Sequence, residues 1–309
     1  MFWLQCGACS GDSMSLLNLE SPDLLELFSD LDLELLWHPS LSVGRHAREH
    51  DELLQSLASG ERPLDILCVE GAVIRGPSGT GMYDTLRRRP KKDLVAALAR
   101  RAGAVVAVGT CASYGGVCGG AEVEGTGLQF HRAESGGFLG AAFRARGGLP
   151  VVNLPGCPVH PEIVAASLSA LVTGTPLELD EFQSPTFLYG MRVHQGCTRN
   201  EYHEYRVEER GFGERGCLFF YMGCQGPMAR GACNRFLWNR RSSKTRVGVP
   251  CFACTRPDFP RAYPFFTTRA IEGLPLELPD GINRPHYLAY KTMAAAAAPE
   301  RLKRRSSGV

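Results

Sequence analysis

The sequence predicts an α/β protein in which a doubly wound parallel sheet is followed by a smaller, irregular domain. Short apolar runs alternate with segments of helical periodicity as far as about residue 183. The remaining residues form short pieces rich in glycine, arginine and aromatic side chains, with little periodicity. With 309 residues, 44% of them hydrophobic, the chain has enough apolar surface for two cores. We therefore expect domains at 1–183 and 184–309.

The elements of the first domain follow each other in an order typical of a flavodoxin-like sheet. Strand after helix after strand produces parallel pairing, and ligands then gather beyond the carboxyl ends of the strands. Pro161 stands where a helix prefers proline, in its first turn. The expected strands are 1–6, 33–36, 64–69, 104–109 and 149–154, and the expected helices are 23–29, 46–56, 93–102 and 161–172.

Composition bears on the compartment and on the partners. A net charge of +2 does not single out a nucleic acid, and we expect none as a partner. Met1–Trp3 leaves no room for a secretory leader, and no uncharged run has the length of a membrane span. We therefore expect a cytoplasmic protein, with peripheral membrane association as a variant of that location. Twelve cysteines in a reducing compartment indicate metal or redox chemistry rather than disulfides.

The second domain concentrates residues that bind soft metals. A single Cys-x-x-Cys pair would fit zinc, but zinc sites usually combine two compact pairs, and the spacing here is uneven. Iron–sulfur clusters accept widely separated thiolates and an occasional histidine, so the pattern favours clusters. Ligation would also supply order to a segment that lacks apolar periodicity. The candidates are His194, Cys197, His203, Cys217, Cys224, Cys233, Cys251 and Cys254.

Seven short motifs occur together along the chain. They are Cys-Ser-Gly-Asp-Ser (9–13), Val-Glu-Gly (69–71), Gly-Thr-Cys-Ala (109–112), Pro-Gly-Cys-Pro (155–158), His-x-x-Cys (194–197), Gly-Cys-Gln-Gly-Pro (223–227) and Cys-x-x-Cys (251–254). In this order the set resembles the small, electron-transferring subunit of nickel–iron hydrogenases. The resemblance implies three iron–sulfur clusters in this chain and a large partner subunit that holds the nickel–iron centre.

The resemblance also assigns ligands in the second domain. The distal 4Fe-4S cluster would take His194, Cys197, Cys217 and Cys224. The medial cluster would take Cys233, Cys251 and Cys254, which suits 3Fe-4S. Lys244 stands where the family often has proline, so no cysteine completes a cubane there. A 4Fe-4S cluster with a ligand other than cysteine remains the alternative.

The proximal 4Fe-4S cluster depends on the register near the amino terminus. Cys6 and Cys9 form an apparent pair, but in the family a tryptophan precedes the first ligand by six residues and the second by nine. Counting from Trp3 selects Cys9 and Asp12. The proximal ligands are then Cys9, Asp12, Cys111 and Cys157, with Cys6 as the alternative. Asp12 could instead only cap the following helix.

Two further residues near this site have competing interpretations. The family places the counterpart of Glu70 close to the proximal cluster, which implies a supporting or proton-handling role. An acid that caps a helix or loop is the simpler interpretation. Cys118 lies seven residues after Cys111 and is expected to be a loop thiol. We place no catalytic residue in this chain apart from that role for Glu70.

The sequence thus predicts the electron-relay subunit of a hydrogenase, with the active site in the large subunit. Electrons would leave through the distal cluster to an acceptor such as a quinone- or cytochrome-linked protein, and the assembly would be a dimer of heterodimers or larger. Two alternatives stay open. One is the small subunit of a hydrogen sensor, and the other is an iron–sulfur subunit of a quinone-reductase-like complex, against which His194-x-x-Cys197 argues.

Overall fold

The chain folds into two compact units. The structure, a computed structural model, describes residues 1–42, 46–279 and 281–303. The first unit comprises Met1–Leu188 and Thr255–Pro260, and the second comprises Tyr189–Cys254 and Arg261–Val309. The division after residue 188 lies beyond the expected boundary at 183, and the chain returns briefly to the first unit at 255–260.

A four-stranded sheet forms the centre of the first unit. All its strands are parallel, and their spatial order is β1-β2-β6-β10. Its two middle strands consist almost entirely of buried residues, as expected for a parallel sheet covered on both faces. The predicted α/β class is therefore confirmed. The strands are β1 (Phe2–Gln5), β2 (Leu64–Glu70), β6 (Ala102–Val108) and β10 (Val152–Leu154).

The predicted strand at 33–36 is wrong. The amide of Leu33 donates to the carbonyl of Phe28 at 2.8 Å, so this residue belongs to the end of the preceding helix at 24–30. Trp37 forms an isolated parallel bridge with Phe2. Pro39 has no amide hydrogen to extend this pairing. The segment therefore runs along the outer edge of β1 without becoming a fifth strand of the sheet.

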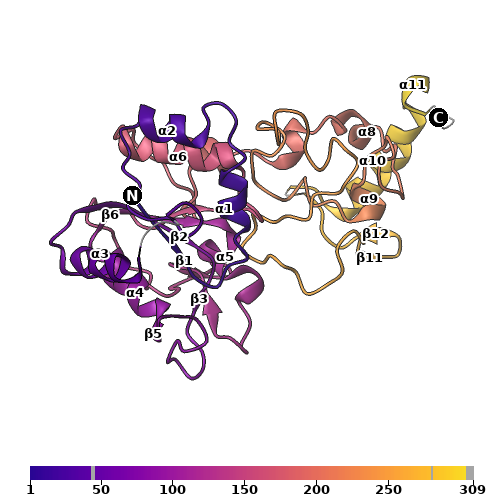
Figure 1. Ribbon diagram of the computed structural model, residues 1–309. Coiled ribbons are helices and arrows are strands. Elements are labelled where there is room, and N and C mark those ends of the chain that lie inside the picture. The colour runs from indigo at the N-terminus through magenta and orange to yellow at the C-terminus, as the bar shows by residue number, and fades with distance from the viewer. Residues whose placement is uncertain (43–45, 280, 304–309) are drawn as a thin grey trace. The chain divides into compact units, whose positions relative to one another are not determined.

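Helices lie on both faces of the sheet, as a doubly wound fold requires. Figure 1 shows α2 and α6 on one side, and α3 and α4 on the other. Leu27 of α2 packs with Ala165 of α6, and the apolar sides of α3 and α4 join the main core. The helices of this unit are α1 (Gly11–Leu16), α2 (Leu24–Asp30), α3 (Ala47–Ser59), α4 (Lys91–Ala99), α5 (Gly109–Tyr114), η1 (Gly116–Cys118) and α6 (Pro161–Val172).

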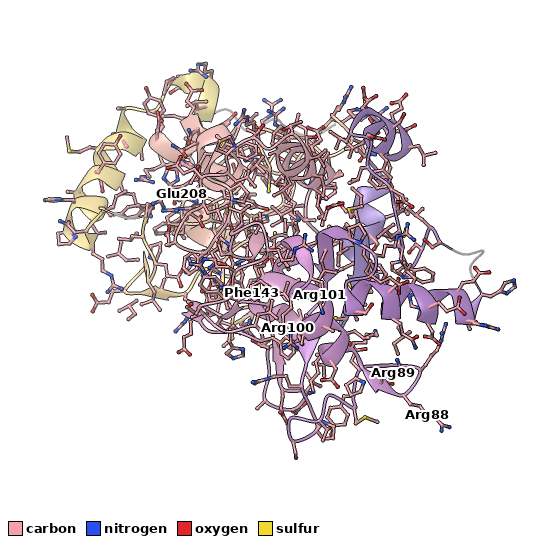
Figure 2. The ribbon with its side chains drawn as sticks, turned by 90° about the vertical axis from the view of Figure 1, so that its left-hand side faces the viewer. Arg88, Arg89, Arg100, Arg101, Phe143 and Glu208 are labelled. Atoms are coloured by element: carbon pink, nitrogen blue, oxygen red, sulfur yellow. The ribbon has the colours of Figure 1, made fainter. Side chains whose placement is uncertain are left out.

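Short antiparallel pairs occupy the loops of the first unit. Figure 2 shows Arg88 and Arg89 on one of them, the β4–β5 hairpin. The pairs are β3 (Val73–Ile74) with β7 (Gly125–Thr126), β4 (Thr85–Leu86) with β5 (Arg89–Pro90), and β8 (Phe130–His131) with β9 (Glu134–Ser135).

In its described residues, the second unit has mostly short helices, one small hairpin and long irregular segments. Its apolar centre is a cluster around Leu218, Phe219 and Phe220 that also contains Tyr287 of α10, the longest helix described in this unit. Among residues placed by the structure, no helix is both long and apolar enough to span a membrane. The elements are α7 (Thr186–Tyr189) at the junction, η2 (Val193–Gly196), α8 (Asn200–Glu204), α9 (Phe219–Met222), β11 (Ala270–Ile271), β12 (Leu274–Pro275), α10 (Arg284–Ala296) and α11 (Glu300–Lys303).

Candidate metal centres

The strand ends of the first unit lie in one row. Strand pairing places Gln5 opposite Glu70, Glu70 opposite Val108, and Val108 opposite Leu154. Because all four strands are parallel, the chain leaves each of them at the same edge. The segments that follow these ends contain Cys6, Cys9, Asp12, Cys111 and Cys157.

Hydrogen bonds join two of these segments directly. The amide of Thr110 donates to the carbonyl of Gly156 at 2.9 Å. The amide of Gly156 donates back to Thr110 Oγ1, also at 2.9 Å. Cys111 and Cys157 each follow one member of this reciprocal pair by a single residue. The pair therefore determines the direction in which the two cysteine-bearing segments leave the sheet.

Glu70 caps the helix that follows Cys9. Its Oε1 accepts the amides of Asp12 and Ser13 at 3.1 and 3.2 Å. Its Oε2 accepts Trp3 Nε1 at 3.0 Å, Gln5 Nε2 at 3.1 Å and Ser13 Oγ at 2.5 Å. A carboxylate at a helix amino terminus also interacts favourably with the helix dipole. Five donors therefore stabilise this buried charge, and the carboxylate orients the ligand-bearing turn.

Asp12 does not cap its own helix. The residue lies in the first turn of α1 and is 9% exposed. Its Oδ1 accepts the amide of Val159 at 2.7 Å, two residues beyond Cys157. Burial raises the pKa of the Asp12 carboxyl to about 7, while the Val159 hydrogen bond lowers it and the charge of Glu70 adds to the rise. Asp12 thus connects its own turn to the turn that carries Cys157.

Glycine at 109 lets Asp12 approach the third ligand turn. Gly109 has φ +84°, and a Cβ built there would lie 2.0 Å from Asp12 Oδ2. Only glycine combines this conformation with such a close approach. The charges of Asp12 and Cys9 both act on the Cys111 thiol, whose pKa burial raises to about 11. Cys9, Asp12 and Cys111 are therefore electrostatic neighbours.

Two other cysteines lie near this edge and differ in environment. Cys6 belongs to the main apolar cluster, and complete burial raises the pKa of its thiol to about 12. Cys118 is half-buried at the end of η1, and its charge would act on Cys111. The spacing of Cys118 gave no sign of this proximity, because η1 folds the chain back toward Cys111.

The four residues predicted to bind the distal cluster line a single cavity. Its empty volume is about 340 Å³, part of it open to solvent. Burial raises the pKa of the Cys217 thiol above its usual range and that of Cys224 to about 11. Uncompensated thiolates would be costly here, whereas metal coordination stabilises them. The lining includes His194, Cys197, Cys217 and Cys224.

The three residues predicted to bind the medial cluster line a second cavity, again with an empty volume of about 340 Å³. Cys233, Cys251 and Cys254 share its wall with Lys244. Burial raises the pKa of the Cys233 thiol to about 12; the charge of Cys254 adds to this rise and that of Lys244 opposes it. The Lys244 ammonium also lies 4.6 Å from the centre of the Phe252 ring. The Lys244 ammonium is therefore part of the cavity wall, and its positive charge favours the thiolate form of Cys233.

The distal and medial cavities adjoin each other. Thr245 lines both of them. The amide of Cys251, a predicted medial ligand, donates to Sγ of Cys224, a predicted distal ligand, at 3.3 Å. Sequence reasoning missed Thr245, because nothing in its local pattern marks a threonine in an irregular segment as a shared wall.

A buried arginine organises the loops around these cavities. Arg199 donates from Nε to the carbonyl of Thr245 and from Nη1 to that of Gly216, both at 2.6 Å. The guanidinium thus holds together segments that carry Cys197, Cys217 and the shared wall. Sequence reasoning missed this residue as well, since its partners are 17 and 46 residues away.

The donor types around the two cavities are those that iron–sulfur clusters use. Within 1–42, 46–279 and 281–303, no three side chains of His, Cys, Asp or Glu converge as the ligands of one metal ion do. An iron–sulfur cluster spreads its protein ligands, because each binds a different iron atom. Buried thiols and a histidine around one cavity fit that requirement.

Comparison with known proteins identifies the family. Residues 9–171 match the family model described as NADH ubiquinone oxidoreductase, 20 Kd subunit. Residues 189–267 match the model for the C-terminal part of the NiFe/NiFeSe hydrogenase small subunit. The chain belongs to the small subunits of nickel–iron hydrogenases. In this family the small subunit transfers electrons and pairs with a large subunit that contains the active site.

Individual relatives agree with this membership. The chain is 31% identical over 287 residues to the F420 non-reducing hydrogenase II small subunit of Methanosarcina mazei, covering 85% of this chain and 73% of that one. It is 30% identical to the periplasmic [NiFeSe] hydrogenase small subunit of Desulfomicrobium baculatum, with 84% of each covered. Among solved structures, the actinobacterial-type NiFe-hydrogenase of Ralstonia eutropha H16 matches with a TM-score of 0.76, 26% identity and coverage of 97% and 92%.

Proposed function

We propose that this hydrogenase small subunit transfers electrons from H2 oxidation in the large subunit through proximal, medial and distal iron–sulfur clusters to an external acceptor. The observation that carries the proposal is the pair of adjoining cavities in the second unit. One is lined by all four predicted distal ligands and the other by all three predicted medial ligands. Bound there, the clusters would supply one-electron redox chemistry.

The proximal set we propose is Cys9, Asp12, Cys111 and Cys157. It is supported by the influence of the Cys9 and Asp12 charges on the Cys111 thiol and by the Asp12–Val159 hydrogen bond beside Cys157. A carboxylate is a harder ligand than a thiolate, so it should exchange more readily and change the potential. The burial of Cys6 within the apolar cluster supports its role as a bystander.

The test uses the complex of this chain with its large subunit. Mössbauer and electron paramagnetic resonance (EPR) spectra are recorded for the wild type and for Asp12→Ala, Cys6→Ala and Cys68→Ala. Cys68 is a fully buried strand thiol and serves as the matched control. We expect only Asp12→Ala to change the proximal signal. An unchanged Asp12→Ala spectrum together with loss of the signal in Cys6→Ala would show that the pair is Cys6 and Cys9.

We further propose a cytoplasmic dimer of heterodimers, or a larger assembly, that delivers electrons to a quinone- or cytochrome-linked protein. The chain is similar to the actinobacterial-type NiFe-hydrogenase of Ralstonia eutropha H16 along 97% of its length, and the proposal extends this likeness to location, assembly and acceptor. Light scattering of the purified complex measures its mass, and cell fractionation locates it. A single heterodimer, or a complex found outside the cytoplasm, would contradict the proposal.

A hydrogen sensor is the competing function. Very slow turnover with artificial dyes, together with binding to a kinase-like partner, would favour the sensor. Rapid H2-driven dye reduction by the complex would favour the electron relay.

A further inference from the structure

His203 lies beside the distal cavity but is not one of its four predicted ligands. It belongs to the short helix α8 and is 9% exposed. Its ring meets the ring of His194 edge-on at a centroid distance of 4.6 Å, and that of Phe219 at 5.4 Å. These contacts hold the imidazole between a predicted cluster ligand and the apolar centre of the second unit.

Both ring nitrogens of His203 have partners. Nδ1 lies 3.4 Å from Sγ of Cys217, and Nε2 lies 3.3 Å from Nη1 of Arg206. An arginine guanidinium carries only donors, so Nε2 must accept from Arg206. The ring proton then resides on Nδ1, where it points at the sulfur. Arg206 therefore selects the tautomer that donates to Cys217.

Arg206 is itself held in place by aromatic rings. Its guanidinium lies 4.4 Å from the centre of the Tyr287 ring and 5.5 Å from that of Tyr290. Both tyrosines belong to α10. Stacking on aromatic faces is a favourable environment for guanidinium. The order of contacts thus runs from α10 through Arg206 and His203 to the Cys217 sulfur.

We infer that His203 is a positioning residue of the distal site, whose Nδ1–H donates to the Cys217 thiolate and raises the reduction potential of the cluster bound there. Hydrogen bonds to cluster sulfurs are among the factors that set such potentials. Reduction adds negative charge to the cluster and its thiolates, so a donor at this sulfur stabilises the reduced state more than the oxidised one. The inference rests on the proposed distal ligand set.

The test compares the complex of this chain with its large subunit in four forms: wild type, His203→Phe, His203→Asn and His286→Phe. Phenylalanine keeps a ring but removes the donor, whereas asparagine places an amide N–H near the position of Nδ1. His286 is exposed on α10 and provides the control. Redox titration followed by EPR gives the distal midpoint potential, and pulsed EPR in H2O and D2O detects the exchangeable proton near the cluster.

We expect His203→Phe to lower the ratio of reduced to oxidised distal cluster about tenfold at the wild-type midpoint, which is about 59 mV for a one-electron couple. One exchangeable-proton coupling should disappear with it, whereas that of the Cys251 amide, which donates to Sγ of Cys224, should remain. His203→Asn should restore most of both, and His286→Phe should change neither. Such a rescue would not follow if His203 only filled space.

Two results would overturn the inference. One is an unchanged potential in His203→Phe when Mössbauer spectra show the distal cluster assembled. The other is a wild-type distal cluster with no exchangeable-proton coupling beyond those of the Cys251 and Arg199 amides, which would contradict the inference even if His203→Phe fails to bind iron. A wild-type complex without any histidine-ligated cluster would instead show that the proposed ligand set is wrong, so the two failures are distinguishable.

Discussion

The two units of the chain position their candidate ligands by different means. In the first, the ligand turns leave a parallel sheet whose middle strands are buried among apolar side chains. In the second, cavities are lined by loops that buried polar groups hold together, such as Arg199 and Asn234, whose Nδ2 donates to the carbonyl of Val193 at 2.7 Å. The first arrangement combines a large apolar core with polar contacts at the strand ends, such as those of Glu70, whereas the second has a small core and polar contacts between irregular loops.

This difference indicates which source of free energy stabilises the folded state of each unit. An extended apolar core provides free energy of folding whether or not a cluster is bound. A region with short helices and cavities lined by buried thiols needs ligation to compensate the entropy of ordering its loops. We therefore expect the first unit to be preformed and the second to depend on iron.

Removal of iron should produce the largest difference between the two units. After chelation of the full-length small subunit, amides within 189–254 should lose protection from hydrogen exchange by several orders of magnitude, because ligation free energy is folding free energy there. Amides of β2 and β6 should keep theirs. Hydrogen–deuterium exchange with mass spectrometry measures both, and equal losses in the two units would contradict the comparison.

Truncation in the sheet should produce the next largest effect. Leu67 in β2 is fully buried, and Leu67→Ala should destabilise the first unit by about 2–5 kcal/mol through lost burial and the remaining cavity. Leu218→Ala, at a 2% exposed site of the second unit, is the matched variant. In the iron-loaded complex we expect it to cost less, because ligation still holds the flanking Cys217. Thermal unfolding and limited proteolysis measure the loss of stability in the two variants. A larger loss for Leu218→Ala would contradict the interpretation.

Gly109→Ala should produce a local effect at the proximal site. Its Cβ would lie 2.0 Å from Asp12 Oδ2, so the carboxylate must move. The strain of a left-handed non-glycine residue adds about 1–2 kcal/mol. We expect a changed proximal EPR signal and an unchanged distal one.

Gly174→Ala is the control for this variant. Gly174 has φ +69°, but nothing lies within 4 Å of a Cβ built there. It should therefore share the strain without the change in the proximal signal. If both variants alter that signal equally, backbone strain rather than contact with Asp12 is responsible.

The smallest expected effect is a pH dependence of the first unit. Burial lowers the pKa of His38 below 6.5, although the charge of Glu70 opposes this shift. Below pH 6.5 the unfolded chain binds a proton at His38 that the folded chain does not, so the contribution of His38 to stability should fall as pH falls. His38→Gln should lose less stability than wild type on acidification. Melting temperatures at a series of pH values measure the difference, and parallel curves would contradict it.

Local pattern was sufficient for much of the first unit. The helix 161–172 was predicted with the bounds that the structure has, because Pro161 marks its start and its periodicity continues to Val172. The prediction of a strand at 33–36 was wrong because strand propensity describes only the segment itself. It takes no account of the end of α2, where the Leu33 amide is already hydrogen-bonded. The helix-capping interpretation of Asp12 failed for a related reason, since Glu70, far away in sequence, performs that role.

The parallel α/β class, the turns that carry thiols and the family resemblance all follow from the amino-acid sequence alone, because they depend on periodicity and short-range spacing. The folded chain was needed to establish that Asp12 contacts the Cys157 turn, that Thr245 lines two cavities, and that Nδ1 of His203 lies 3.4 Å from Sγ of Cys217. Such contacts join residues from different segments. Their geometry arises from tertiary packing, so it cannot be inferred from the spacing of residues along the chain.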